Sequence, residues 1–418
     1  MTRNFLTILL TLCAVVSYAL PIECVGTATQ VVEGTDTLFI FKDEIHLKCP
    51  DGDVDWYRAD GSVYASNTDE IYPDEGCYSA NGCHFCCQLY KGIDSLAFTV
   101  ETRCDASVIH ITHGDISSRA HTYSLSYNAL AWDGEAWYDS AAVMTGKLTK
   151  TISLPPLYDS TLITLCYDKE VRTALGMADS CVEVDVPFDS IKAVNFQMTS
   201  LATTRGKEGE KSNERNRPTS QELITGSEYS GALEVAFYSN PTPAARFFKW
   251  DIYHAAEHLA TRRDQDIRYV FTEPGTYRVV CTALNDLCTA DSAETTVAIA
   301  ESYLAVPNVF TPNGDGMNDE FRVAYRSLAV FHIWVYNRWG KLVYESDDPS
   351  KGWDGTIGGR NAAEGAYFYV VRALGTDAAK DAKYMSKISY NKKKLNADEA
   401  VIGVYQMSGD INLLRGKR

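Results

Sequence analysis

The chain has 418 residues, of which 45% are hydrophobic and 22% are charged, the composition of folded domains rather than of a disordered tail. This length predicts about two to four domains, with enough apolar residues for several cores. The net charge of −16 at pH 7 argues against nucleic acid and anionic lipid as main partners, because an acidic surface repels both.

The amino terminus has the features of a secretory signal peptide. Residues 1–19 combine a short polar start, the apolar run FLTILLTLCAVVSYA, and the small residues Ser17 and Ala19 at a plausible cleavage site. The run is short for a membrane anchor and Pro21 follows it, so an uncleaved anchor is the weaker alternative. No later apolar run reaches the roughly 20 residues of a transmembrane helix. We therefore expect an exported protein.

Short runs of alternating apolar and polar residues, rich in β-branched and aromatic types, follow one another along the rest of the chain. Their spacing is often near the 8–12 residues that are typical of sandwich strands, which predicts an all-β protein. Helical turns are expected only locally, around His254–Arg263 and Asp377–Lys383. The expected domains are residues 20–104, 105–189, 190–302 and 303–418.

Export makes disulfides the expected state of the cysteines. Eleven of the 12 Cys remain after removal of the signal peptide, and seven of these lie in residues 20–104, which leaves one to pair elsewhere or stay free. There, Cys49 ends a strand, Trp56 follows, and Cys104 closes a later strand, which resembles the immunoglobulin pattern of two cysteines and a core Trp. The run CHFCC, residues 83–87, also suggests zinc, but disulfides are the stronger interpretation.

Two further cysteine pairs are each expected to form a disulfide across a hairpin. Cys166 and Cys181 lie at the inner ends of two alternating strands, and Cys281 and Cys288 flank the turn residues ALND. Bridges that close loops this short contribute on the order of 2–3 kcal/mol in the chain-entropy model.

The run YVFTEPGTYRVVCTALND, residues 269–286, resembles the closing hairpin of polycystic-kidney-disease-type (PKD) sandwich domains, and Trp250-Asp251 stands where that family has its Trp-Asp strand. The family's usual Gly-Asp-Gly is missing after it, so the resemblance implies a fold and no ligand, with Trp250 in the core. The polar run TTRGKEGEKSNERNRPTS, residues 203–220, has no apolar periodicity and predicts a mobile loop or hinge.

One motif raises the alternative of a secreted hydrolase. His254, Glu257 and His258 match H-x-x-E-H, the inverted zinc-protease pattern, in which a helix places both His on one face and Glu activates a metal-bound water. The motif lies between two β runs, and no third ligand can be named. A five-residue pattern has a high rate of false matches, so we expect a protein that is not an enzyme.

Five motifs near the carboxyl terminus occur in a fixed order: NVFTPNGDGMND, FHIWVYNRWGKLVYES, WDG, GAYFYVV and GDINLLR. Together they resemble the gliding-motility-associated C-terminal domain, the type B sorting domain of the type IX secretion system. The resemblance implies a seven-stranded, immunoglobulin-like sandwich recognised by the outer-membrane translocon. Residues 374–406 form a long, Lys-rich insertion relative to that pattern. The motif positions are Asn308, Phe310, Pro312, Asn313, Gly314, Asp315, Gly316, Asn318, Asp319, Asn337, Arg338, Trp339, Gly340, Trp353, Asp354, Gly355, Gly365 and Tyr367.

The first of these motifs has three interpretations. Asn313, Asp315, Asn318 and Asp319 alternate with glycines as in part of a calcium loop, but the EF-hand register would put Met317 at a ligand position. Catalysis would need a partner acid or base, and none is adjacent. We favour a turn, in which the Asx side chains bond the local backbone and the glycines adopt positive φ.

Charge divides the chain in the same place as the motifs. Residues 303–418 hold 16 Lys+Arg and 13 Asp+Glu, a net of +3, which leaves 23 basic and 42 acidic residues, a net of −19, for residues 1–302.

We expect tandem immunoglobulin-like and PKD-like sandwiches, without a cofactor, carried by a sorting domain to the cell surface or the medium. The translocon and an extracellular protein or glycan are the expected partners, in an adhesive or structural role.

Overall fold

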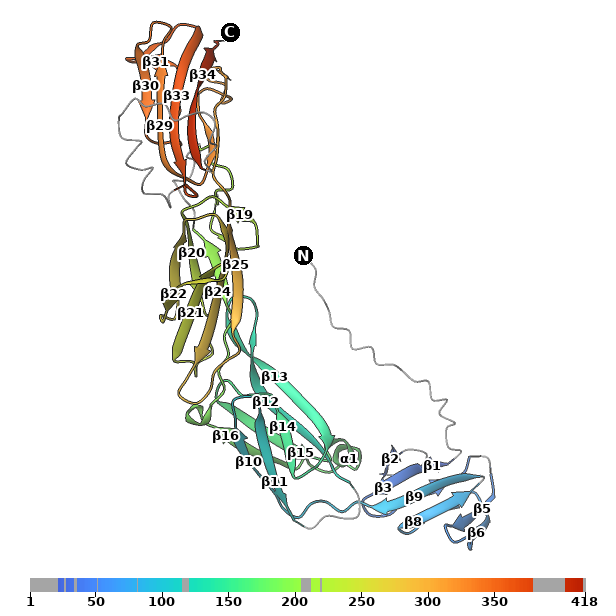
Figure 1. The fold of residues 1–418 in the computed structure, drawn as a ribbon. Coiled ribbons are helices and arrows are strands. Elements are labelled where there is room, and N and C mark those ends of the chain that lie inside the picture. Colours follow the sequence, from blue (N-terminus) through green and yellow to red (C-terminus); the bar gives the residue numbers. More distant parts are fainter. Residues whose placement is uncertain are drawn as a thin grey trace. The chain divides into compact units, whose positions relative to one another are not determined.

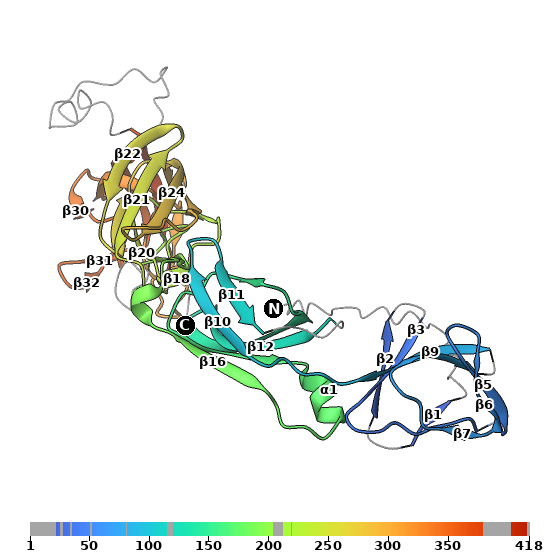
Figure 2. The same ribbon diagram turned by 90° about the horizontal axis from the view of Figure 1, so that it is seen from below.

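The computed structural model describes residues 22–25, 28–33, 36–50, 52–80, 82–114, 120–203, 212–218, 220–378 and 403–415. Within them the fold is all-β, as predicted, apart from one short helix, α1 (Lys169–Ala174), and one 3-10 turn, η1 (Phe188–Ser190) (Figures 1 and 2). Two compact units comprise residues 1–131 with 139–191, and residues 132–138 with 192–418. The predicted signal peptide and most of the turn predicted at Asp377–Lys383 lie outside the described residues.

The first sandwich lies in the first unit. Its strands are β1 (Glu23–Cys24), β2 (Ala28–Glu33), β3 (Asp36–Phe41), β4 (Leu47–Lys48), β5 (Val54–Arg58), β6 (Val63–Thr68), β7 (Glu70–Ile71), β8 (Gly76–Ala80) and β9 (Cys83–Leu89). The sheets β1-β4-β7 and β2-β3-β9-β8-β5-β6 share one core. Trp56 is fully buried there, its indole Nε1 donating to the carbonyl of Thr68 at 2.9 Å, as expected for the core Trp of an immunoglobulin-like sandwich.

The second sandwich makes up the rest of the first unit, except that residues 132–138, at the tip of its β12–β13 hairpin, belong to the second unit. Its strands are β10 (Leu96–Thr102), β11 (Ser107–His113), β12 (Thr122–Trp132), β13 (Trp137–Lys147), β14 (Thr151–Leu154), β15 (Thr161–Tyr167) and β16 (Cys181–Val186). They form the sheets β10-β11-β14 and β13-β12-β15-β16, which bury alternate residues such as Ile109, Leu125 and Ile163. Strand β10, expected to close the first domain, pairs instead with β11.

The third sandwich opens the second unit. Its strands are β17 (Thr199–Ala202), β18 (Glu222–Leu223), β19 (Glu228–Tyr229), β20 (Leu233–Tyr238), β21 (Phe247–His254), β22 (Glu257–Arg262), β23 (Ile267–Phe271), β24 (Gly275–Leu284) and β25 (Ala293–Ile299). They form the sheets β18-β17-β20-β23 and β19-β25-β24-β21-β22 around a core centred on Trp250, Phe237 and Phe271. Trp250 is fully buried, as predicted.

The fourth sandwich contains the five carboxyl-terminal motifs. Its strands are β26 (Tyr303–Ala305), β27 (Val309–Phe310), β28 (Ala324–Arg326), β29 (Leu328–Tyr336), β30 (Leu342–Ser346), β31 (Thr356–Ile357), β32 (Arg360–Asn361), β33 (Gly365–Gly375) and β34 (Val404–Leu413). The sheets β26-β28 and β27-β34-β33-β29-β30 bury one core around Phe310, Phe321 and Trp353, and β31-β32 is an accessory hairpin. Seven strands in two sheets match the predicted immunoglobulin-like sandwich.

The polar run at residues 203–220 is not wholly the loop or hinge that its composition predicts. Residues 204–211 and 219 lie outside the described residues, but residues 212–218 run beside β28. The amide of Arg215 donates to the carbonyl of Tyr325 at 2.8 Å, and the Arg215 guanidinium stacks 4.4 Å from the ring centre of Tyr303. Main-chain bonding and a cation–π contact hold this segment where apolar periodicity is absent.

Candidate functional site

The loop between β27 and β28 is built around one carboxylate. Asp319 accepts three main-chain N–H groups, from Asn313 at 3.0 Å, Gly314 at 2.6 Å and Gly316 at 2.8 Å. Both glycines adopt positive φ, +83° and +85°, which an L side chain would strain. A carboxylate that caps several amides fixes the path of an irregular loop, so the favoured turn interpretation describes what these residues do.

Further hydrogen bonds within the loop occupy the other candidate calcium ligands. Asp315 accepts from the side-chain amide of Asn313 at 2.9 Å and from the main-chain amide of Met317 at 2.8 Å, while Asn318 adopts φ +52° and its carbonyl accepts from the amide of Thr311. Among the described residues no group of three or more His, Cys, Asp or Glu side chains is arranged to hold a metal ion. These polar groups thus bond to one another and to the backbone within the loop.

The WDG motif closes the core beside this loop. Trp353 is 1% exposed, its Nε1 donates to the carbonyl of Thr356 at 2.8 Å, and its ring lies 5.4 Å from Phe310 and 4.9 Å from Tyr367 between ring centres. Asp354 caps the following turn by accepting from the amide of Thr356 at 2.9 Å. These motif residues therefore stabilise the sandwich.

Arg415 joins the separate motifs, a role that sequence inspection did not assign to it. Its guanidinium donates to the carbonyl of Pro312 at 3.1 Å and to the carbonyl of Gly355 at 2.8 Å. Gly355 has φ +74°, and a Cβ there would lie 3.0 Å from the Pro312 ring and 3.2 Å from the side chain of Leu413. The positive φ and the crowding together explain the glycine of WDG.

The remaining motif residues set strand register at the same end of the sandwich. The carbonyl of Asn308 accepts from the amide of Asn412 at 2.9 Å, where β27 runs parallel to β34. Gly365, at φ +131°, lies opposite Leu413 at the start of β33, and the Tyr367 hydroxyl donates to the carbonyl of Ala363 at 2.8 Å. These bonds align the carboxyl-terminal strand with the rest of the sheet.

The NRWG turn differs from the other motifs because its bonds leave one large side chain in solvent. The Asn337 side-chain oxygen accepts from the amides of Trp339 and Lys341, both at 3.0 Å, and Gly340 turns the chain at φ +77°. Trp339 is 75% exposed, and the Arg338 guanidinium stacks 4.3 Å from its ring centre. The turn is rigidly built, yet it presents an indole outward.

The third and fourth sandwiches are joined through a buried serine. Ser327 has φ +50° and no exposed surface; its hydroxyl donates to the carbonyl of Ala300 and accepts from the amide of Gly231, both at 2.8 Å. Its own amide donates to the hydroxyl of Ser230 at 2.9 Å. Serine is common in loops, so nothing in the local sequence marks this position.

Only part of the predicted disulfide pattern is present. Cys166–Cys181 is bonded because the two residues lie directly opposite each other on β15 and β16, and Cys77–Cys86 is bonded for the same reason on β8 and β9. The disulfide between Cys49 and Cys104 that the immunoglobulin pattern implies is absent. Cys49 is a free thiol buried in the first sandwich, whereas Cys104 is disulfide-bonded and follows β10 of the second sandwich.

The expected Cys281–Cys288 disulfide is also wrong. Cys281 faces the third-sandwich core from within β24 and is a free thiol with no exposed surface, and burial raises its pKa to about 12. Cys288 lies beyond the end of β24, in the turn where its carbonyl accepts from the amide of Asn285, and is itself disulfide-bonded. Both side chains are buried in the third-sandwich core, yet they are not bonded to each other.

The helix expected around the H-x-x-E-H motif is a β-hairpin, so that expectation is wrong. His254 ends β21 and stacks 4.3 Å from the ring centre of Tyr277. His258, on β22, lies opposite Tyr253 of β21, and its Nε2 donates to the Asp251 carboxylate at 3.2 Å. Neighbouring strand residues point to opposite faces, so the two imidazoles do not converge on one point.

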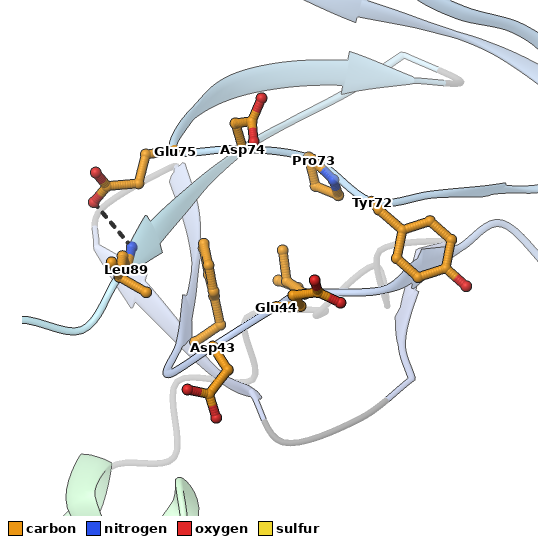
Figure 3. Close-up of a pocket in the computed structure, with 9 residues that line it drawn as sticks. Asp43, Glu44, Tyr72, Pro73, Asp74, Glu75 and Leu89 are labelled. Carbon is orange, nitrogen blue, oxygen red and sulfur yellow. Dashed lines mark hydrogen bonds between the residues drawn. The ribbon is translucent and has the colours of Figure 1, made fainter.

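A pocket of about 490 Å³ opens in the first sandwich beside Tyr72 (Figure 3). Glu75 lies at one end, accepting from the amide of Leu89 at 3.0 Å, and the Tyr72 ring lies at the other. Tyr72 is 60% exposed and stacks 4.5 Å from the ring centre of His46. Asp43, Glu44 and Asp74 also line the pocket.

Fold and motif geometry together define a β protein with a carboxyl-terminal immunoglobulin-like sandwich. Residues 304–388 match the family model described as CHU_C Type IX secretion signal domain, so the chain carries a domain of that family. The match implies export through the outer membrane by the type IX system, with engagement of its translocon. No helix of the described part is long and apolar enough to cross a bilayer.

Other comparisons add little. No curated protein matches the chain. The crystal structure of chicken CNTN1 FN1-FN3 domains is similar at 11% identity, covering 68% of this chain and 93% of that chain with a TM-score of 0.22. Such a score carries no argument about how the domains are arranged.

Proposed function

We propose that residues 303–418 deliver the chain to the cell surface and that the three preceding sandwiches, the passenger, act there as a binding or structural module. The observation that carries the proposal is the complete core of the fourth sandwich, formed from the five motifs and placed after disulfide-bonded sandwiches. Disulfides suit a protein that works outside the cytoplasm.

Deletion and fusion test the delivery step. In type IX-competent cells, the full chain should reach the surface and a chain lacking residues 303–418 should remain in the periplasm. A reporter fused to residues 303–418 should follow the full chain, and should stay periplasmic in cells without a working translocon. Surface display of the truncated chain would contradict the proposal.

A binding role for the passenger is supported by the pocket beside Tyr72. An exposed ring offers a flat apolar face, and the carboxylates of Glu44 and Asp74 accept hydrogen bonds from hydroxyl groups. That combination suits a glycan better than an anionic ligand, which the carboxylates would repel.

Glycan arrays with matched variants test the pocket. Tyr72→Ala should lower binding at least ten-fold if the ring is a contact, whereas Tyr138→Ala, which truncates a 49% exposed tyrosine of the second sandwich, should leave it unchanged. Equal binding by both variants and the wild type would place the ligand elsewhere.

We also propose that the passenger acts by binding and not by hydrolysis. Support comes from the hairpin, in which His258 bonds Asp251 and His254 stacks on Tyr277. Purified protein should contain no stoichiometric zinc, and any peptidase activity should be the same in Glu257→Gln. Zinc at one equivalent together with activity lost in that variant would overturn this proposal.

A further inference from the structure

Two tryptophans of the carboxyl-terminal motifs have opposite environments. Trp353 is 1% exposed within the core, whereas Trp339 is 75% exposed at the turn between β29 and β30. The turn is held by the Asn337 side chain and by Gly340, so the position of the indole owes nothing to core packing. Exposing a large aromatic side chain on a fixed turn is the arrangement of an interface anchor.

Apolar side chains continue from Trp339 across the sheet. Tyr336 on β29 lies opposite Leu342 on β30 and opposite Phe368 on β33, and directly opposed residues share a sheet face. Their neighbours Val335 and Tyr367 are buried, so this row faces away from the core. Leu342 is 40% and Phe368 47% exposed. We call Tyr336, Trp339, Leu342 and Phe368 the Trp339 patch.

Two cations border the patch at its turn end, and the exposed Asp410, opposite Phe368, borders its other end. Arg338 stacks on Trp339, Lys341 follows Gly340, and neither forms an ion pair within the described residues. Residues 303–418 have a net charge of +3, against −19 for residues 1–302. A partner surface with carboxylates facing the turn end of the patch would attract Arg338 and Lys341 and repel the acidic passenger, which gives orientation as well as affinity.

We propose that the Trp339 patch is the surface by which the fourth sandwich docks on an acidic-rimmed, apolar site of the type IX translocon. The inference rests on the proposed export function and names the contact that such export uses. Trp339 is the anchor, Leu342 and Phe368 extend its apolar contact, and Arg338 and Lys341 pair with partner carboxylates.

Export of the full chain, with an epitope tag in the passenger, tests the proposal in type IX-competent cells. Trp339→Ala should lower the rate of surface appearance at least ten-fold, with accumulation in the periplasm, and Arg338→Glu with Lys341→Glu should also lower it. Met317→Ala is the matched control, because that side chain is 70% exposed in the same sandwich and lies outside the patch. Protease resistance of the periplasmic protein should be unchanged, since Trp339 supports no core contact.

Different outcomes separate the two levels of inference. If the wild-type chain and the chain lacking residues 303–418 appear at the surface at the same rate, the export function itself fails. If the wild type is exported and Trp339→Ala is exported equally fast, only the docking surface is refuted. Concentration-dependent dimerisation of the purified wild type that Trp339→Ala abolishes, with export unchanged, would assign the patch to a second copy of this chain and overturn the proposal.

Discussion

Alanine at Gly355 should destabilise the fourth sandwich more than alanine at Gly340, although the two residues have nearly the same backbone. Their φ angles are +74° and +77°, so each substitution incurs the left-handed cost of an L residue, about 1–2 kcal/mol. A Cβ on Gly340 meets no atom within 4 Å, whereas one on Gly355 lies 3.0 Å from Pro312. Overpacking adds about 1–3 kcal/mol at Gly355 alone.

Hydrogen exchange of the full chain measures this difference within the sandwich itself. The slowest amides of β33, at the centre of the five-stranded sheet, exchange through opening of the whole sandwich. Gly355→Ala should lower their protection about 5- to 150-fold further than Gly340→Ala does, since each 1.4 kcal/mol is a factor of ten. Equal losses in the two variants would show that crowding against Pro312 is not what selects glycine in this motif.

Further predictions concern the disulfide, the buried thiol, the Asp319 loop and the serine junction. Replacing Cys166 and Cys181 by Ser should cost on the order of 3 kcal/mol in denaturant unfolding, and no change in midpoint would contradict a stabilising role for the bridge. The Cys281 thiol, with its pKa raised to about 12, should resist maleimide at pH 8 and react only in denaturant; ready labelling of the native chain would mean that the site opens. Calcium at millimolar concentration should not shift the melting temperature, because the loop's carboxylates already bond backbone amides, and a clear upward shift would establish an ion site. Asp319→Ala should lower the free energy of unfolding by about 2–3 kcal/mol through loss of those bonds. Ser327→Ala should lower it by about 1–3 kcal/mol, because the Gly231 amide loses its buried partner. An unchanged unfolding curve would contradict the corresponding account.

Local sequence was sufficient where the relevant physics is local. Alternation of apolar and polar residues predicted the all-β class, because a half-buried strand has a period of two. The order of the carboxyl-terminal motifs indicated the sandwich that residues 303–415 form, and the spacing of Cys166 and Cys181 across one hairpin indicated their bond. The immunoglobulin-like and PKD-like patterns placed Trp56 and Trp250 in the core, and both are fully buried.

Tertiary structure decided the questions that depend on distant strands. The H-x-x-E-H residues are compatible with a helix in isolation, but pairing of β21 with β24 and of β22 with β21 makes their segment a β-hairpin. Cys49 and Cys281 are free thiols buried in the cores of their own sandwiches, whereas Cys104 and Cys288 are disulfide-bonded, so spacing along the chain did not identify the partners. Trp339 and Trp353 stand in neighbouring motifs of similar composition, yet one is a buried core residue and the other is exposed at a turn. Residue type sets the hydrophobicity of a side chain, whereas the packing of the two sheets decides which side chains remain at the surface.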